Sequence, residues 1–154
     1  MAEPDVAVQT VIAAPPEELY GMVSDLPRMG EWSPENTGAS WRGGAAGPEV
    51  GARFVGKNAN GWHRWVTFGK VVEAEPGQAF AFDVSAGPFK VARWRYTFEA
   101  ADAGTTVTEE WYDQRGALVR FGGKPASGVG DRAAHNRAGM EQTLANLKAA
   151  VEAQ

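Results

Sequence analysis

The sequence contains no cysteine and only two histidines, and these shortages exclude several kinds of chemistry. Without cysteine the chain has no disulfide, no thiolate nucleophile, no thiolate zinc site and no iron–sulfur cluster. His63 and His135 lie in different predicted elements, and no third ligand stands at a matching spacing. We therefore expect each histidine to be a surface or hydrogen-bonded residue, and we expect neither a metal site nor a cofactor.

Long apolar runs and an excess of positive charge are also missing. No apolar run approaches the roughly 20 residues that span a bilayer, and the first residues, Met1 to Asp5, are acidic where a signal peptide would be basic. These features predict a cytoplasmic protein with no integral membrane segment. A net charge of −4 gives no general attraction to nucleic acid. The expected partner is a small molecule, and the expected state is a monomer or weak homodimer.

Tryptophan is abundant instead, with six residues in a chain of 154. A chain of this length can form one domain with a sizeable core, so we expect a single domain over residues 1–154. Rings as large as tryptophan can fill that core. They also line apolar ligand sites, where the indole N–H offers a polar contact. Both interpretations stay open at this point.

The end of the chain predicts one long amphipathic helix from about Asp131 to Glu152. One stripe recurs at spacings of three and four residues, and it contains Asn136, Met140, Thr143, Leu144, Leu147 and Val151. The region before this helix consists of strands and glycine-rich turns, so the stripe has to pack on a sheet. This indicates an α+β fold. A curved sheet around a single helix tends to enclose a cavity.

The rest of the chain predicts a strand at Val6–Ile12 and two short elements after it. Pro15 and Pro16 suit the first turn of a helix, and residues 25–34 suit a second short helix or a turn. Turn sequences such as Glu75-Pro76-Gly77 join the later strands and favour an antiparallel meander. The six later strands are expected at Thr37–Arg42, Ala52–Asn58, His63–Ala74, Ala79–Ser85, Val91–Ala100 and Thr105–Arg115.

Two segments carry a resemblance to a known superfamily. Residues 11–20, Val-Ile-Ala-Ala-Pro-Pro-Glu-Glu-Leu-Tyr, and residues 24–34, which read Ser-Asp-Leu-Pro-Arg-Met-Gly-Glu-Trp-Ser-Pro, are similar to its opening strand-to-helix and following segments. Later stretches at 71–77, 94–99 and 104–108 resemble its strands and turns. The superfamily is that of helix-grip proteins, with START lipid-transfer domains, pollen allergens and bacterial polyketide cyclase/dehydrase-like proteins. The resemblance implies a curved antiparallel sheet of about seven strands around a long C-terminal helix, with two short helices after the first strand.

Alternation within the last two strands predicts which residues face the concave side. One face of the sixth strand carries Ala92, Trp94, Tyr96 and Phe98, and one face of the seventh carries Val107, Glu109, Trp111 and Asp113. An inward glutamate among tryptophan rings would have a raised pKa and could act as a general acid or base. In the alternative, this part of the last strand is solvated or its alternation breaks.

The leading hypothesis for function is the binding of a hydrophobic or aromatic small molecule of the lipid, polyketide or isoprenoid type. Its alternatives are a polyketide cyclase/dehydratase-type enzyme and an interaction or stress-response domain with a vestigial pocket. Candidate groups for the enzyme are Arg64, Arg93, Arg95, Tyr96, Tyr112 and Glu109. The predicted ligand-binding residues are Trp32, Phe54, Trp65, Trp94, Tyr96, Glu109, Trp111, Phe121, Met140 and Leu144.

Glycine-rich segments predict where the cavity opens. Gly116–Gly130 has an apolar centre that includes Phe121, and we expect it to flank the entrance together with the segment Val50–Gly61. In the alternative, Gly116–Gly130 is a fixed connection. Its end superficially resembles a dinucleotide-binding glycine motif, but the chain ends after the following helix, so the parallel βαβ unit that this motif requires is missing. The start of that helix could still hold an anion, with Arg132 nearby.

Overall fold

The computed structural model describes residues 3–45, 47–115 and 131–152. Seven strands form one antiparallel sheet in the order β1-β7-β6-β5-β4-β3-β2. Its strands are β1 (Val6–Ile12), β2 (Asn36–Arg42), β3 (Arg53–Asn60), β4 (His63–Glu75), β5 (Ala79–Ala86), β6 (Phe89–Ala101) and β7 (Gly104–Asp113). The helices are α1 (Pro16–Ser24), the 3₁₀ helix η1 (Leu26–Glu31) and α3 (Arg132–Glu152). This confirms the predicted α+β helix-grip architecture and the antiparallel meander.

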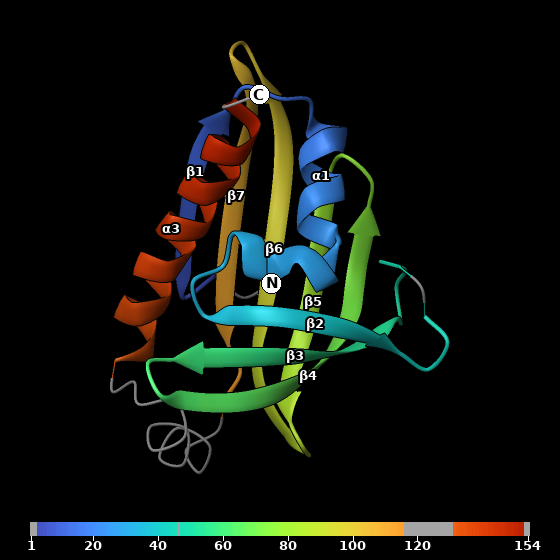
Figure 1. The fold of residues 1–154 in the computed structure, drawn as a ribbon. Helices are drawn as coiled ribbons and strands as arrows, with labels where there is room; N and C mark the ends of the chain where they lie inside the picture. Colours follow the sequence, from blue (N-terminus) through green and yellow to red (C-terminus); the bar gives the residue numbers. More distant parts are fainter. Residues whose placement is uncertain (1–2, 46, 116–130, 153–154) are drawn as a thin grey trace.

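The sheet bends strongly along its length. In Figure 1 β1, β7, β6 and β5 stand upright behind the helices, whereas β2 and β3 run across the lower half of the molecule. Register shifts within the β4–β5, β5–β6 and β2–β3 pairs mark irregularities of the kind that bend strands and increase their twist. The bend gives the sheet a concave side, and α1, η1 and α3 lie on that side.

The short helices form where the proline-rich segment predicts them. Pro15 has an extended backbone and Pro16 begins α1, with Glu17 and Glu18 in the first turn near the positive helix end. Leu19, Tyr20 and Val23 turn inward and are buried. η1 follows at once, and its Leu26 and Met29 are buried as well. Both helices therefore pack their apolar sides into the concavity.

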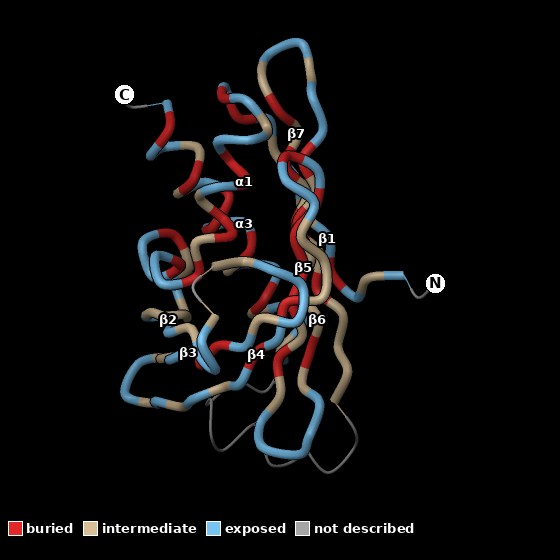
Figure 2. Tube along the Cα trace, turned by 90° about the vertical axis from the view of Figure 1, so that its right-hand side faces the viewer, coloured by how far each residue is buried: buried red, intermediate tan, exposed pale blue. Residues whose placement is uncertain are grey.

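The long helix closes the concave side. Figure 2 shows buried residues concentrated where the helices face the upright strands. The predicted stripe is confirmed, because Asn136, Met140, Thr143, Leu144, Leu147 and Val151 are the buried residues of α3. Near its end, Lys148 Nζ donates to the Val11 carbonyl at 2.8 Å and Glu152 Oε2 accepts from the Ala13 N–H at 3.1 Å. These bonds tie the last turns of α3 to β1.

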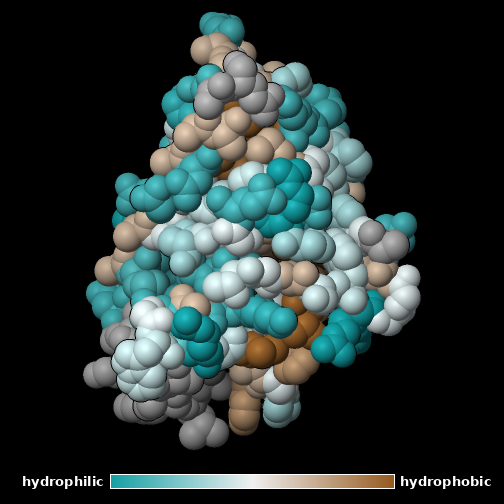
Figure 3. Space-filling model, in the orientation of Figure 1, coloured by the Kyte–Doolittle hydropathy of each residue, from teal (hydrophilic) through white to brown (hydrophobic). Residues whose placement is uncertain are grey.

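The outer surface is more polar than the concave side. Figure 3 shows a largely polar face with a small apolar area in its lower half, where β2, β3 and β4 cross the front of Figure 1. Exposed large apolar side chains do occur, and in the part of the chain that the structure describes the most exposed is Trp62, at 83%. Within the described residues, no helix combines the length and apolar character that a membrane crossing requires.

Candidate functional site

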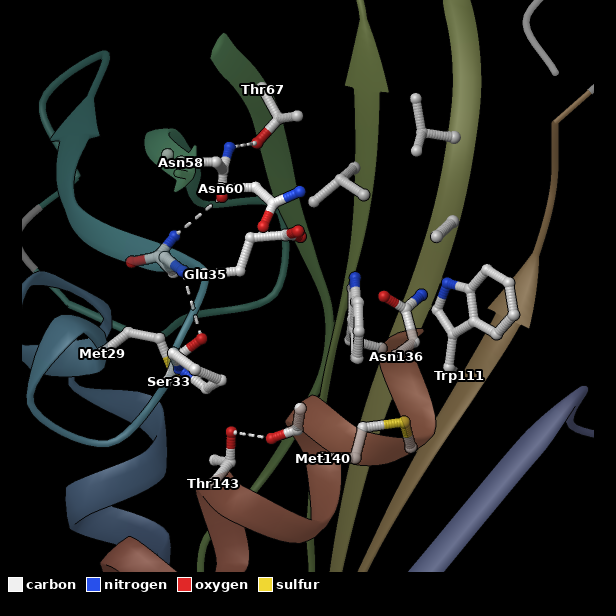
Figure 4. Close-up of a pocket in the computed structure, with 18 of the residues that line it drawn as sticks. Met29, Ser33, Glu35, Asn58, Asn60, Thr67, Trp111, Asn136, Met140 and Thr143 are labelled. Carbon is white, nitrogen blue, oxygen red and sulfur yellow. Dashed lines mark hydrogen bonds between the residues drawn. The ribbon is translucent and has the colours of Figure 1, made fainter. Parts of the chain in front are cut away.

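A cavity of about 660 Å³ lies between the concave face of the sheet and α3. Its lining comes from η1, from β2 to β7 and from the first half of α3. Figure 4 looks into it, with residues of β3 and β4 facing Trp111, Asn136 and Met140 across an open centre. The concave bend of the sheet leaves this space between its strands and α3.

Aromatic rings form much of the wall. Trp94 and Trp111 are opposite each other on β6 and β7, and their ring centroids are 6.4 Å apart. The Phe54 ring meets Phe82 edge to face, with centroids 5.3 Å apart at 81°. Met140 adds a flexible apolar side chain from α3. The wall therefore offers large, mostly rigid apolar surfaces to any molecule inside.

A glycine on β4 makes room for one of these rings. Gly69 is paired with Phe54 across β3 and β4, and a Cβ atom at Gly69 would overlap the Phe54 ring. Phe54 is held on its other sides by edge-to-face contacts with Trp41 and Phe82. The absence of a side chain at Gly69 thus fixes where this ring lies in the cavity wall.

Replacing Gly69 with alanine is expected to displace the Phe54 ring and to destabilise the fold by about 1–3 kcal/mol. Urea unfolding measures this change. Gly21→Ala is the matched control, because Gly21 lies in α1 and a Cβ atom there would have no neighbour within 4 Å. The control is expected to gain up to about 1 kcal/mol in stability from helix propensity. A Gly69 variant as stable as the wild type would contradict this packing.

A buried acid faces the same cavity. Glu109 on β7 is paired with Tyr96 on β6, and the Tyr96 hydroxyl donates a hydrogen bond to Glu109 Oε2 at 2.8 Å. Both side chains line the cavity, and their residues are only 2% and 3% exposed. The other carboxyl oxygen, Glu109 Oε1, is buried and has no hydrogen-bond partner among the described residues. The carboxyl group therefore has unused hydrogen-bonding capacity.

Burial changes the acidity of this pair. Desolvation raises the pKa of Glu109 to about 8, against the smaller opposing effect of the Tyr96 hydrogen bond. Burial, and then the neighbouring glutamate, raise the pKa of Tyr96 well above its usual value. Glu109 is therefore protonated at neutral pH and can donate a hydrogen bond as well as accept one. Glu109 lines the cavity, as the alternation of β7 predicts.

The opposite side of the cavity carries neutral polar groups. Asn36 Nδ2 donates to Asn58 Oδ1 at 3.4 Å, and Asn58 Nδ2 donates to Thr67 Oγ1 at 3.2 Å. Ser33 Oγ accepts from the Asn36 N–H at 3.2 Å. Figure 4 shows Ser33, Asn58 and Thr67 on the side of the cavity away from Trp111. This chain of side chains from β2 to β4 can orient a polar part of a ligand.

A charged cluster joins the start of α3 to the segment before β2. Arg132 Nη1 donates to both oxygens of Glu35, each at 2.9 Å, and His135 Nε2 lies 3.0 Å from Glu35 Oε2. The Arg132 guanidinium also lies over the Trp65 ring, 5.8 Å from its centroid. These four residues line the cavity. The cluster holds the first turn of α3 against the lower strands, and Glu35 already occupies the anion position beside Arg132.

The structure brings together most of the predicted ligand-binding residues. The cavity is lined by Phe54, Trp65, Trp94, Tyr96, Glu109, Trp111 and Met140. Trp32 and Leu144 are buried but do not line it. The Trp32 backbone accepts a hydrogen bond from Asn146, which places this residue beside a later part of α3. Leu144 lies one helical turn beyond Met140 and belongs to the buried core. Phe121 and the segment Gly116–Gly130 lie outside the described residues.

Four of the candidate catalytic groups lie on the convex side of the sheet. Arg93 pairs with Asp83 at 2.6 Å, and Arg95 pairs with Glu73 at 2.8 Å and with Glu110 at 3.2 Å. Arg64 and Tyr112 alternate with the inward residues of their strands in the same way. The prediction that these groups act in the cavity is wrong, because period-two alternation turns them outward. Only Tyr96 and Glu109 of that set line it.

The segment Val50–Gly61, which the sequence predicts to flank the entrance, contributes part of the cavity wall. Most of it is the strand β3, and only residues 54, 56 and 58–61 line the cavity. Sequence reasoning missed the lining residues Met29, Ser33, Glu35, Asn36, Asn58, Asn60, Thr67, Phe82, Arg115 and His135. Alternation with Phe54 would have found Asn58 and Asn60. No sequence pattern identifies Glu35, which precedes its strand.

Among the described residues, no group of three or more histidine, aspartate or glutamate side chains could hold a metal ion. Arg115, Arg132 and His135 of the cavity are instead paired with carboxylates, whereas the acid Glu109 is hydrogen-bonded to Tyr96. Arg115, for example, pairs with Asp113 at 2.9 Å. The chemistry that these side chains can supply is hydrogen bonding and proton transfer within an apolar cavity.

The chain is similar to a known protein family and to several solved structures. Residues 3–152 match the family described as "Polyketide cyclase / dehydrase and lipid transport". A Polyketide_cyc-like protein from Corynebacterium glutamicum, Cgl2372, is 31% identical, with 99% of this chain and 94% of that chain covered and a TM-score of 0.65. No curated protein matches the chain.

More distant solved structures share the fold. Protein CV1439 from Chromobacterium violaceum is 17% identical, with a TM-score of 0.70 and 96% of each chain covered. The di-domain ARO/CYC StfQ of the steffimycin biosynthetic pathway is 13% identical with a TM-score of 0.73, and the match covers 96% of this chain and 50% of that one. At these identities the likeness concerns the fold.

Proposed function

The chain belongs to the family described as polyketide cyclase / dehydrase and lipid transport, and from this premise we propose that its cavity binds a hydrophobic or aromatic small molecule of the lipid, polyketide or isoprenoid type. The observation that carries the proposal is the cavity itself. Its volume of about 660 Å³ falls within the roughly 300–1,000 Å³ of small-molecule sites. A vestigial pocket would instead be filled by the chain's own side chains.

The lining supports an apolar ligand with few polar groups. Phe54, Phe82, Trp94, Trp111 and Met140 are among the cavity's apolar lining residues. Burial of apolar ligand surface contributes roughly 25 cal/mol per Å², before the costs of ordering the ligand and its surroundings. The amide and hydroxyl groups of β2 to β4 then select the orientation of the ligand, since each polar group left unpaired on binding lowers the affinity for it.

Filling the cavity from within is expected to abolish binding. Ala39 lines the cavity from β2, whereas its neighbour Ser40 is exposed on the other face of the same strand. Ala39→Trp should lower the affinity for naphthalene-type fluorescent probes at least about tenfold, because the new ring occupies their space. Ser40→Trp is the matched control and should bind as the wild type does. Displacement titrations measure both.

Native mass spectrometry of protein purified from its own host provides the direct test of binding. A retained apolar molecule that is absent from the Ala39→Trp variant supports the proposal. If the wild type retains no ligand and a panel of fatty acids, sterols, flavonoids and fused-ring ketones leaves its tryptophan emission unchanged, the proposal fails. The emission is a suitable reporter because Trp65, Trp94 and Trp111 line the cavity.

A second candidate function is a cyclase- or dehydratase-type enzyme. The observation that favours it is Glu109, a cavity acid whose pKa is raised to about 8, close to the range in which proton transfer to and from a ligand is efficient. In this role Glu109 would transfer protons and Tyr96 would orient it. Incubation with poly-ketone substrates and product analysis tests this function, and Glu109→Gln should abolish turnover while binding persists.

A further inference from the structure

Glu109 has a feature that packing alone does not account for. Its carboxyl group is buried, and Oε1 has no partner among the described residues although Oε2 is hydrogen-bonded. Buried polar atoms in folded proteins are nearly always paired, so an unpaired one in a cavity wall points to a missing partner. We propose that Glu109 and Tyr96 form an anchor, which hydrogen-bonds an uncharged carbonyl group of the ligand and disfavours carboxylates. This inference rests on the proposed function.

The geometry holds the acid in one orientation. Glu109 and Tyr96 are directly opposite in the β6–β7 register, which places their side chains close together on the concave face. The Tyr96 hydroxyl is 2.8 Å from Oε2, so the carboxyl group cannot turn without losing that bond. Oε1 therefore stays directed to the same place. A preorganised group of this kind favours one ligand orientation, since it need not be ordered on binding.

The surroundings keep the acid neutral. Tyr96 contacts Glu109, and no charged side chain in the described part of the chain contributes to the change in the pKa of Glu109. Among the described residues, the other ionisable groups that line the cavity are Glu35, Arg115, Arg132 and His135, and each has an ion-pair or hydrogen-bond partner. A neutral carboxyl group can donate a hydrogen bond to a carbonyl oxygen.

The same surroundings disfavour a ligand carboxylate. Such a group would be buried beside Glu109 with no unpaired cation among the described cavity residues to balance it. The nearest apolar wall, including Trp94 and Trp111, gives a low local dielectric that increases this penalty. A ketone loses less on leaving water and gains the bond to Glu109. The anchor therefore distinguishes neutral ketones from fatty-acid-like ligands.

Three probes that share one ring system test this inference. The first is propionyl-dimethylamino-naphthalene, a neutral fluorescent ketone. The second carries a carboxylate in place of the propionyl group, and the third carries a propyl group. At about pH 6, where Glu109 is protonated, the ketone is expected to bind about 5–10-fold more tightly than the propyl probe and at least about tenfold more tightly than the carboxylate.

Two variants and one control localise the effect. Glu109→Leu should remove the preference for the ketone over the propyl probe, because no donor remains at that position. Glu109→Gln keeps a donor amide and should keep the preference, but without the loss of ketone affinity that the wild type shows as the pH rises through about 8. Glu110→Gln, on the convex face, should retain the wild-type preference and its pH dependence.

The infrared carbonyl stretch of the bound ketone reports the bond directly. It should lie at lower frequency in the wild type than in Glu109→Leu, a difference that a purely structural role would not produce. Equal affinity for the ketone and propyl probes in the wild type would overturn the anchor while the proposed function stands. Binding of none of the three probes, with no ligand retained in native mass spectrometry, would overturn both.

Discussion

Glu109→Gln is expected to make the protein more stable than the wild type at alkaline pH, with a gap that closes as the pH falls towards about 4.5. The folded-state pKa of Glu109 is about 8, whereas the ordinary value is 4.5. Between these values the unfolded chain releases the proton and the folded protein keeps it. The wild type thus loses stability across this interval, at about 1.4 kcal/mol per pH unit and roughly 3–5 kcal/mol in total.

The variant isolates this effect from other titrations. Glutamine keeps the shape of the side chain and can still accept the Tyr96 hydrogen bond, but it does not ionise. Urea unfolding of both proteins from about pH 4.5 to pH 9.5 gives the difference at each pH. Glu110→Gln serves as the control, since that carboxylate pairs with Arg95 on the convex face. A gap that does not change with pH would mean that Glu109 ionises normally.

Alternation predicts the centre of the site because it depends on local geometry alone. Successive side chains of a strand point to opposite faces, so one inward residue determines the direction of its neighbours. Once Trp94 and Tyr96 are assigned inward, the aligned face of the next strand brings in Glu109 and Trp111. The same rule places Arg93 and Arg95 on the convex face, although both are candidate groups for the enzyme hypothesis. For these two arginines the enzyme hypothesis names residues that do not line the cavity.

Position along a strand and contacts between distant segments are less predictable. The sequence predicts that Trp32 and Leu144 contact the ligand, but both are buried in the core beside the cavity. Their depth depends on how η1 and α3 pack. The hydrogen-bonded side chains from Asn36 to Thr67 require the irregular β2–β3 register at Asn36. No turn sequence predicts this irregularity. Glu35 meets His135 across a separation of 100 residues. Such contacts follow from the three-dimensional packing.

The second large expected effect concerns Leu144, which lies in the core and does not line the cavity. Leu144→Ala should destabilise the protein by about 2–5 kcal/mol, because it removes a fully packed side chain between α3 and the sheet. Leu144 is 2% exposed and does not line the cavity, so no ligand space is available to absorb the change. Urea unfolding without ligand measures the loss. A loss below about 1 kcal/mol would show that α3 is not an integral part of the core.

The same variant separates stability from binding. Glu141→Ala, exposed on the same helix, is the matched control and should change stability by less than about 0.5 kcal/mol. At a temperature where Leu144→Ala remains folded, its affinity for the naphthalene ketone should stay close to the wild-type value, because Leu144 does not line the cavity. Met140→Ala, on the previous turn, should alter both the stability and the affinity for the naphthalene ketone, because Met140 lines the cavity wall. Loss of ketone affinity in folded Leu144→Ala would instead place the ligand deeper along α3 than the cavity extends.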